Sequence, residues 1–319
     1  MADKQNLVIG ILANIFPIQP HHITEIRKIV PSATVIEYAP ETIAEANIDI
    51  LLSFRLPQEI LDNSKQLKWV HALSAGVDDF IPKLRNTDII LTNSSGVHPI
   101  PIAEHVFGML LMHNRRLNKA VLSQQQKEWK AYRHDVSELN GKTILILGYG
   151  AIGIQIGKIA KAFGMAVIGT KRTKTREQYA DTIIAHDELS SYIPKADYIV
   201  IALPATPDTF HFFGSNYLAL MKQDAAIVNI GRGEVIDEHA LIETLKERKD
   251  ITALLDVFET EPLPPSSPLW GMDNVLITAH YAGATPEYMD RAIAIFCANL
   301  KAYIEGRKMP NLVEKELGY

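Results

Sequence analysis

The chain has 319 residues, of which 47% are hydrophobic and 22% charged, and its formal net charge is -5. This balance is typical of a folded globular protein with room for two domains, and it excludes a disordered chain. A mildly acidic chain has no general attraction for nucleic acid or an anionic membrane, and no apolar run is long enough to span a bilayer. The single cysteine, Cys297, excludes an internal disulfide. The apolar stretch at residues 7–18 contains Asn14 and Pro17 and has a weak positive flank, which argues against a signal peptide, so the default expectation is a cytoplasmic protein.

The N-terminal part of the chain alternates strand-like and helix-like segments. Strands are expected at residues 7–12, 34–38, 48–54, 69–73 and 89–92, with a helix at 22–29 and a further short segment at 59–61. A long helix follows at 102–118, and then polar sequence at 123–140. Strands that alternate with helices indicate a parallel sheet with helical crossovers, so this region is expected to form one small α/β domain.

A second α/β series occupies the rest of the chain. Its expected strands are residues 143–147, 166–169, 198–203, 226–230, 251–256 and 275–278, and a last helix is expected at 286–305. This rhythm is typical of a dinucleotide-binding sheet.

A glycine-rich turn directly follows the first strand of this series and opens a helix. Its residues are Gly148, Tyr149, Gly150, Ala151, Ile152 and Gly153. In a dinucleotide-binding turn the first glycine makes the tight bend, the second lets a pyrophosphate approach the backbone, and the third allows close packing of helix on strand. The alternative is a glycine-rich turn that binds nothing.

The strand at 166–169 ends where an NAD-binding protein carries an acidic ribose ligand. Here Lys171, Arg172 and Thr173 follow, with Lys174 behind them, and the nearest acid is Glu177. Basic groups suit a 2′-phosphate, so the sequence predicts that NADP(H) is preferred and NAD(H) is possible. The alternative is a solvated surface loop with incidental charge.

Four further motifs occur in a fixed order along the chain. The first motif is residues 74–78, which begin with Ser74. The other three are residues 229–241 around Arg232, residues 255–263 around Glu261, and residues 274–285 around His280. Together with the glycine-rich turn they resemble the D-isomer-specific 2-hydroxyacid dehydrogenase family, and glyoxylate/hydroxypyruvate reductases within it. Many members carry proline before the histidine, where this chain has Ala279.

The resemblance implies an oxidoreductase that transfers hydride between NADP(H) and a small 2-keto or 2-hydroxy acid such as glyoxylate or hydroxypyruvate. His280 would be the acid/base, paired with Glu261, which favours its protonated form, and Arg232 would bind the substrate carboxylate through its planar fork of donors. The expected substrate-binding residues are Arg55, Ser74, Ala75, Gly76, Arg232 and His280. The expected cofactor-binding residues are Gly148, Tyr149, Gly150, Ala151, Ile152, Gly153, Lys171, Arg172, Thr173, Leu203, Pro204, Thr209, Ile230, Gly231, Arg232, Asp256, His280, Ala282 and Gly283.

The expected architecture is α/β, with two Rossmann/flavodoxin-like domains whose parallel sheets flank an active-site cleft. Residues 1–98 plus 287–319 would form the substrate domain and residues 99–286 the cofactor domain. The resemblance also implies a homodimer, formed largely by the cofactor domain and the long helix with its following arm.

Several alternatives stay open at this point. One is an NAD enzyme like phosphoglycerate dehydrogenase, and another is a co-repressor-like binding protein that recognises peptides. A purely structural role is the alternative for each proposed catalytic residue: Arg232 could only shape a turn, Glu261 could be an ordinary loop carboxylate, and His280 could only end a strand. His98 and His105 are expected to be structural, and no motif indicates a metal site.

Overall fold

A computed structural model describes residues 7–13, 15–39, 42 and 47–316 of the chain. The chain forms two compact units: unit 1 comprises Met1–His98 and Thr285–Tyr319, and unit 2 comprises Pro99–Ala284. Each unit is built on one parallel sheet, which confirms the predicted α/β class. Unit 2 ends at Ala284, whereas the sequence placed that boundary at residue 286. The cleft stays a prediction.

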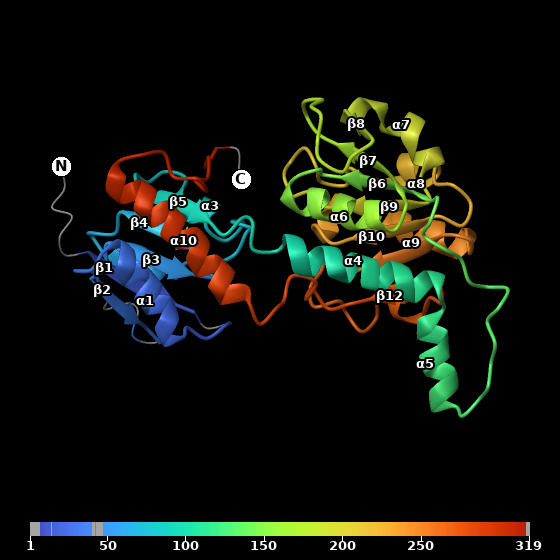
Figure 1. Cartoon of the computed structure of the whole chain (residues 1–319), viewed down its shortest axis with the longest axis horizontal. Helices are drawn as coiled ribbons and strands as arrows, with labels where there is room; N and C mark the ends of the chain where they lie inside the picture. Colours follow the sequence, from blue (N-terminus) through green and yellow to red (C-terminus); the bar gives the residue numbers. More distant parts are fainter. Residues whose placement is uncertain (1–6, 14, 40–41, 43–46, 317–319) are drawn as a thin grey trace. The chain divides into compact units, whose positions relative to one another are not determined.

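Unit 1 has a five-stranded parallel sheet in the order β2-β1-β3-β4-β5, the flavodoxin-like order (Figure 1). Its strands are β1 (Val8–Leu12), β2 (Thr34–Glu37), β3 (Ile50–Ser53), β4 (Trp69–Ala72) and β5 (Ile90–Asn93). Its helices are α1 (Pro20–Ile29), α2 (Gln58–Asn63), α3 (Ile81–Leu84) and α10 (Tyr288–Glu305).

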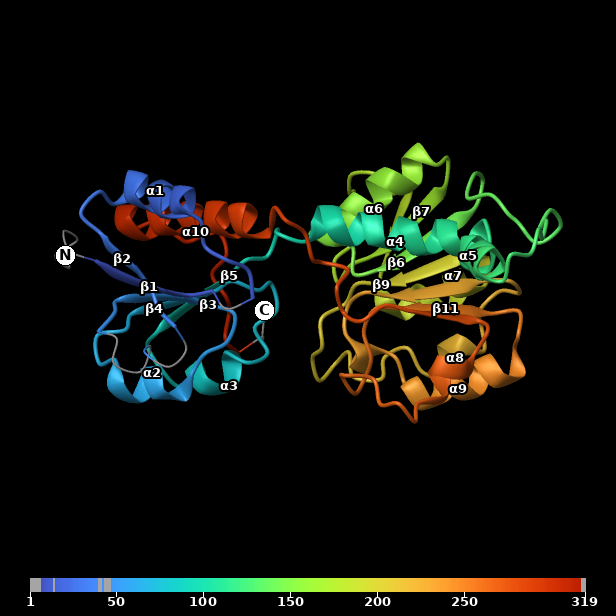
Figure 2. The ribbon, with the colours of Figure 1, turned by 90° about the horizontal axis from the view of Figure 1, so that it is seen from below.

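Helices cover both faces of this sheet. Figure 2 shows α1 and α10 on one face and α2 and α3 on the other. Strands β3 and β4 are buried along their whole length, as expected for parallel strands between two helical layers. Cys297 packs against the core on the α10 side, where burial raises the pKa of its thiol to about 11. The cysteine is therefore a small packing residue.

Unit 2 has a seven-stranded parallel sheet in the order β12-β11-β10-β9-β6-β7-β8. Its strands are β6 (Thr143–Leu147), β7 (Ala166–Thr170), β8 (Thr182–Ile184), β9 (Tyr198–Ile201), β10 (Ala226–Asn229), β11 (Thr252–Leu255) and β12 (Val275–Ile277). From β6 the strands follow in sequence order outwards to β8 on one side and, starting at β9, outwards to β12 on the other, so the topological switch point lies between β6 and β9. Doubly wound sheets bind their ligands at this point.

The helices of unit 2 are α4 (Pro99–Asn114), α5 (Leu117–Gln125), α6 (Ala151–Ala162), α7 (Leu189–Tyr192), α8 (Ser215–Leu218) and α9 (Glu238–Glu247). Helices α4 and α6 lie on one face of the sheet, and α8 and α9 on the other (Figure 2). The expected helix at residues 102–118 is interrupted, because Arg116 adopts the left-handed conformation with φ 55°. Helix α5 therefore leaves the line of α4 and projects from unit 2 (Figure 1).

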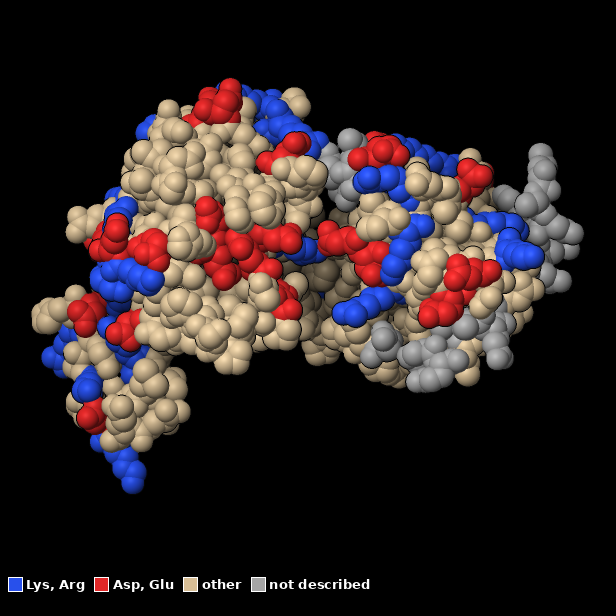
Figure 3. Space-filling view, turned by 180° about the vertical axis from the view of Figure 1, so that it is seen from behind, with Lys and Arg blue, Asp and Glu red and all other residues tan. Residues whose placement is uncertain are grey.

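On the side of unit 2 shown in Figure 3, acidic side chains gather in a band across the middle, and basic side chains lie mainly towards the edges. None of the helices in the described ranges combines the length and apolarity that a membrane crossing needs.

Candidate active site

The carboxyl ends of the strands of unit 2 gather most of the residues singled out from the sequence. All neighbouring strands of this sheet pair in parallel, so their carboxyl ends share one edge. The loops that leave β6, β7, β9, β10, β11 and β12 there begin at or near Gly148, Lys171, Leu203, Gly231, Asp256 and His280. This shared edge is the expected binding edge of a doubly wound sheet.

The glycines of the 148–153 turn meet different demands. Gly148 has φ 93°, and a Cβ there would lie 2.7 Å from the Ala202 carbonyl oxygen. A Cβ on Gly153 would lie 2.7 Å from the Gly148 carbonyl oxygen. A Cβ on Gly150 would meet nothing within 4 Å, so open space lies beside the N-terminus of helix α6. That opening, with helix amides directed at it, fits a pyrophosphate.

Tyr149 does not present its side chain to this opening. Its ring is buried against Gly157 and Gly169, where added Cβ atoms would lie 2.2 and 2.3 Å from Tyr149 atoms. Its hydroxyl donates to the Gln178 carbonyl oxygen at 2.9 Å, and burial raises the pKa of the phenol to about 12. The expected cofactor contact at Tyr149 is therefore restricted to its backbone.

The basic loop after β7 also differs from the expectation. Glu177, the nearest acid along the sequence, turns back and pairs with the Lys171 ammonium. This hydrogen bond lowers the pKa of the Glu177 carboxyl. Lys174 pairs with Glu188 at 2.6 Å, while Arg172 and Thr173 are exposed. The loop therefore holds a carboxylate as well as cations, and Lys171 already has an anionic partner.

The loops after β9 and β10 contact each other. A Cβ on Gly231 would lie 2.5 Å from the Leu203 carbonyl oxygen, so glycine permits this approach. Thr209 donates its hydroxyl to the Pro204 carbonyl oxygen at 2.6 Å, which closes the loop after β9. Leu203 and Ile230 are buried and Pro204 is exposed.

Arg232 lies in a turn that is fixed from two sides. The buried Asn229 side chain accepts from the Gly231 amide at 3.1 Å and donates to the Arg232 carbonyl oxygen at 3.0 Å. A Cβ on Gly233 would lie 1.9 Å from the Phe258 carbonyl carbon, so the arginine turn packs directly on the backbone that leads to Glu261. The half-buried guanidinium donates to the Gly231 carbonyl oxygen at 2.9 Å.

Two carboxylates hold the same loops together, and sequence reasoning missed both. The Glu238 amide donates to Glu259 Oε1 at 3.0 Å, and the Glu259 amide donates to Glu238 Oε2 at 3.1 Å. His211 Nε2 lies 2.7 Å from Glu259 Oε1, at an angle that makes no hydrogen bond. Burial and the Glu259 charge raise the pKa of Glu238. This carboxylate clasp ties the start of α9 to the loop that carries Glu261.

His280 and Glu261 form a direct pair. His280 Nδ1 lies 2.6 Å from Glu261 Oε2, and Glu261 Oε1 accepts from the Phe258 amide at 3.0 Å. An ionised carboxylate only accepts, so Nδ1 carries the shared hydrogen and Nε2 is the nitrogen left for a substrate. The His280 side chain is 50% exposed and that of Glu261 34%, so the pair is open to solvent. This arrangement can orient an imidazole for proton transfer.

The turn at His280 is held in an unusual conformation by Asp256. His280 has φ 51°, a left-handed conformation that is unfavourable for a non-glycine residue. Its amide donates to the Asp256 carbonyl oxygen at 2.8 Å, and the Tyr281 and Ala282 amides donate to the Asp256 carboxylate at 3.2 and 3.0 Å. The buried Asp256, which the sequence predicts only as a cofactor-binding residue, therefore anchors the turn.

The expected substrate-binding residues of unit 1 lie at the carboxyl edge of its own sheet. Asn93 donates to the Ala75 carbonyl oxygen at 2.8 Å, and the Ser74 hydroxyl donates to the Gly76 carbonyl oxygen at 2.7 Å. Within the described ranges the Ala75 and Gly76 amides donate to no protein acceptor, so both can bind a carboxylate. Arg55 is exposed just beyond β3.

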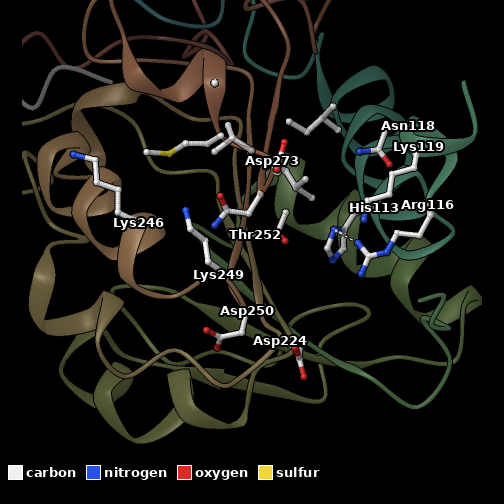
Figure 4. Close-up of a pocket in the computed structure, with 16 residues that line it drawn as sticks. His113, Arg116, Asn118, Lys119, Asp224, Lys246, Lys249, Asp250, Thr252 and Asp273 are labelled. Atoms are coloured by element: carbon white, nitrogen blue, oxygen red, sulfur yellow. Dashed lines mark hydrogen bonds between the residues drawn. The ribbon is translucent and has the colours of Figure 1, made fainter. Parts of the chain in front are cut away.

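A pocket of about 710 Å³ lies elsewhere in unit 2, near the start of α5 (Figure 4). Thr252 and Val275, which begin β11 and β12, both line it, so it lies at the amino edge of the sheet. Basic side chains near the start of α5 and around the end of α9 line it together with acidic ones: Arg116, Lys119, Lys246, Lys249, Asp224, Asp250 and Asp273 (Figure 4). Because it is at the opposite edge of the sheet, it is separate from the loops described above.

One side-chain group in the described ranges has metal-ligand character: His21, His22 and Asp290 of unit 1. His22 Nδ1 accepts from the Gln19 amide at 3.0 Å, so the ring hydrogen is on Nε2, which lies 2.9 Å from Asp290 Oδ1. A nitrogen that donates its hydrogen to a carboxylate does not ligate a metal, so this group is a hydrogen-bonded contact between α1 and α10.

Comparisons with known proteins identify a family. Residues 107–282 match the family model of the D-isomer specific 2-hydroxyacid dehydrogenase NAD binding domain. The glyoxylate reductase of Aeropyrum pernix is 35% identical over 84% of this chain and 82% of its own length. The D-3-phosphoglycerate dehydrogenase of Methanocaldococcus jannaschii is 35% identical over 87% of this chain, which spans only 55% of that relative.

A solved structure shows the same fold. The D-isomer specific 2-hydroxyacid dehydrogenase from Xanthobacter autotrophicus Py2, in complex with NADPH and MES, has a TM-score of 0.84 and 26% identity, covering 98% of this chain and 99% of its own. The chain therefore belongs to the D-isomer specific 2-hydroxyacid dehydrogenase family, and it is a nicotinamide-dependent oxidoreductase that acts on CH–OH groups.

Proposed function

We propose that this D-2-hydroxyacid dehydrogenase reduces a small 2-keto acid of the glyoxylate or hydroxypyruvate kind, with His280, Glu261 and Arg232 as its catalytic residues. The observation that carries the proposal is the 2.6 Å pair of His280 Nδ1 and Glu261 Oε2, on a loop that packs against the arginine turn. The curated relatives named glyoxylate reductase support the substrate class.

The residues divide the work as follows. The helix α6 amides beside Gly150 would hold the pyrophosphate of the cofactor, which supplies or accepts a hydride when bound. His280 would give a proton from Nε2 to the keto oxygen during reduction, while Glu261 keeps the ring in one orientation. Arg232 would bind the substrate carboxylate through its fork of donors. In unit 1, the Ala75 and Gly76 amides would bind substrate, and Arg55 would favour an anionic or hydroxylated side chain.

The test is a screen of 2-keto acids with NADPH and with NADH, followed at the nicotinamide absorbance. We expect the highest kcat/KM with glyoxylate or hydroxypyruvate. Oxidation of 3-phosphoglycerate with NAD as the best reaction would favour the phosphoglycerate dehydrogenase alternative. No turnover with any keto acid would contradict the proposal and favour a co-repressor-like binding protein.

We further propose that the enzyme prefers NADP(H). The support is Arg172 with Thr173, exposed beyond β7, because a charge-assisted hydrogen bond to the 2′-phosphate contributes about 1.5–3 kcal/mol, or tenfold and more in affinity. Arg172→Ala and Lys171→Ala should each lower the NADPH/NADH ratio of kcat/KM, and the double variant should lower it further. A wild-type preference for NADH would refute this part.

We also propose a homodimer, through α4 and the α5 arm, in the cytoplasm. Helix α5 carries the exposed apolar residues Leu117, Val121 and Leu122, and Trp129 in the loop beyond it is fully exposed. The half-buried edge strand β12 and the pocket at the base of α5 provide a neighbouring surface for a second copy (Figure 4). Sedimentation velocity tests the dimer.

A further inference from the structure

A hydrogen-bond chain runs from helix α4 to the turn that carries His280. His105 Nε2 on α4 lies 3.0 Å from Thr278 Oγ1, and the Thr278 hydroxyl lies 2.6 Å from Asp256 Oδ1. Asp256 in turn accepts the amides that fix the left-handed conformation at His280. None of the family motifs described above includes His105, which the sequence indicated to be structural.

The hydrogen bonds from His105 to Asp256 can be donated in only one direction. Thr278 has a single hydroxyl hydrogen, and an ionised carboxylate can only accept, so this hydrogen is donated to Asp256. The oxygen of Thr278 is then an acceptor for His105, which must carry its hydrogen on Nε2. Burial lowers the pKa of His105, while the Asp256 charge opposes this effect, so the neutral ring is favoured near neutral pH.

The ring of His105 is also fixed in orientation. It meets the Tyr281 ring edge-on, with centroids 5.4 Å apart and planes at 88°. Tyr281 directly follows His280, so His105 contacts the turn both through Thr278 and through this ring. Helix α4 begins at Pro99, where the chain enters unit 2, and the turn precedes Ala284, where it leaves. His105 thus links these two connecting segments.

We infer that His105 is a positioning residue for His280: by donating from Nε2 to Thr278 it holds Asp256 in place to fix the catalytic turn. The inference rests on the proposed role of His280. It can be tested separately from that role, because the hold on the turn consists of hydrogen bonds within the protein. Removal of the donor should loosen the 280–282 amides, and replacement by another donor should preserve them.

The first experiment is hydrogen–deuterium exchange of the full-length protein without ligands. His105→Leu removes the donor, His105→Gln keeps an N–H donor, and His239→Leu makes the same change at an exposed site on α9. We expect faster exchange at residues 280–282 only in His105→Leu. Unchanged exchange in that variant, or equally fast exchange in His105→Gln, would overturn the inference, whether or not the enzyme is active.

The second experiment is kinetic and uses a double-mutant cycle with Thr278→Val. A lost neutral hydrogen bond corresponds to about a three- to tenfold fall in kcat, with little change in the Kd of NADPH. We expect His105→Gln to stay within about twofold of wild type by the same reasoning, and the His105→Leu/Thr278→Val double variant to be no worse than either single variant. If the losses in kcat of the two single variants added up in the double variant, the inference would be overturned. If His105→Leu does not fold, hydrogen–deuterium exchange of Thr278→Val at residues 280–282 tests the inference instead. A wild type that turns over no keto acid, with the exchange result as expected, would refute the proposed function and leave the His105 contact standing.

Discussion

Gly233→Ala should separate the arginine turn from the loop of Glu261. The added Cβ would lie 1.9 Å from the Phe258 carbonyl carbon and 2.4 Å from the Glu259 amide nitrogen, which are backbone atoms that no rotamer change can move. Restoring ordinary contact at about 3.4 Å requires a displacement of about 1.5 Å. A misplacement of about 1 Å in a catalytic site can lower the rate by about 10²-fold, and overpacking costs about 1–3 kcal/mol of stability.

The assay compares kcat/KM for keto-acid reduction, the Kd of NADPH and the denaturant midpoint. We expect kcat/KM to fall by about 10²-fold, with a much smaller change in cofactor binding. Gly214→Ala is the matched control, because its Cβ would meet nothing nearer than 3.5 Å. If Gly233→Ala retained kcat/KM within about threefold, the loops would not need this contact and the reasoning would fail. Glu259→Ala against Glu259→Gln tests the same coupling if the glycine variant does not fold, since glutamine keeps an acceptor for the Glu238 amide.

The remaining predictions concern single groups. Arg232→Lys keeps the charge but loses the fork, so kcat/KM should fall by about ten- to a hundredfold; wild-type kinetics would exclude bidentate binding. His280→Ala should lower kcat by about two to four orders of magnitude at unchanged NADPH affinity, and a near-normal rate would remove His280 from the mechanism. Burial lowers the pKa of His71 from the ordinary 6.5 to about 3, so the unfolded chain binds this proton more readily than the folded protein does. The free energy of unfolding should therefore fall as the pH drops from about 6.5 towards 3, by about 1.4 kcal/mol per pH unit. Urea unfolding at several pH values checks this, and His71→Gln should lose that slope. Val121→Asp on the exposed side of α5 should shift a dimer to monomer in sedimentation velocity; an unchanged dimer would place the interface elsewhere.

The sequence predicts those parts of the fold that depend on local pattern. Continuous apolar runs locate the buried strands, and β6 has the predicted bounds because a covered parallel strand needs apolar residues on both faces. The interruption between α4 and α5 was not predictable, because Arg116 favours helices and only the structure shows its left-handed conformation.

Contacts between distant segments account for the rest. His105 and Thr278 are 173 residues apart, and Glu238 and Glu259 are 21 apart, so no motif spacing indicates either contact. The pairing of Glu177 with Lys171 was missed for another reason. The long Glu177 side chain reaches back along the loop, which a count of residues cannot show. The motifs indicate which groups react, whereas the hydrogen-bond partners that fix them come from tertiary packing.

The burial of Tyr149 makes three positions interdependent in any attempt to redesign cofactor preference. Its ring fills space that Gly157 and Gly169 leave open, and its hydroxyl holds the Gln178 carbonyl beyond the basic loop. A loop exchanged to alter cofactor preference would therefore have to keep the carbonyl at position 178 within reach of the Tyr149 hydroxyl, unless residues 149, 157 and 169 were exchanged with it. An alanine at position 157 or 169 would in turn require a smaller side chain at 149, so compensating pairs of substitutions should be the tolerated ones.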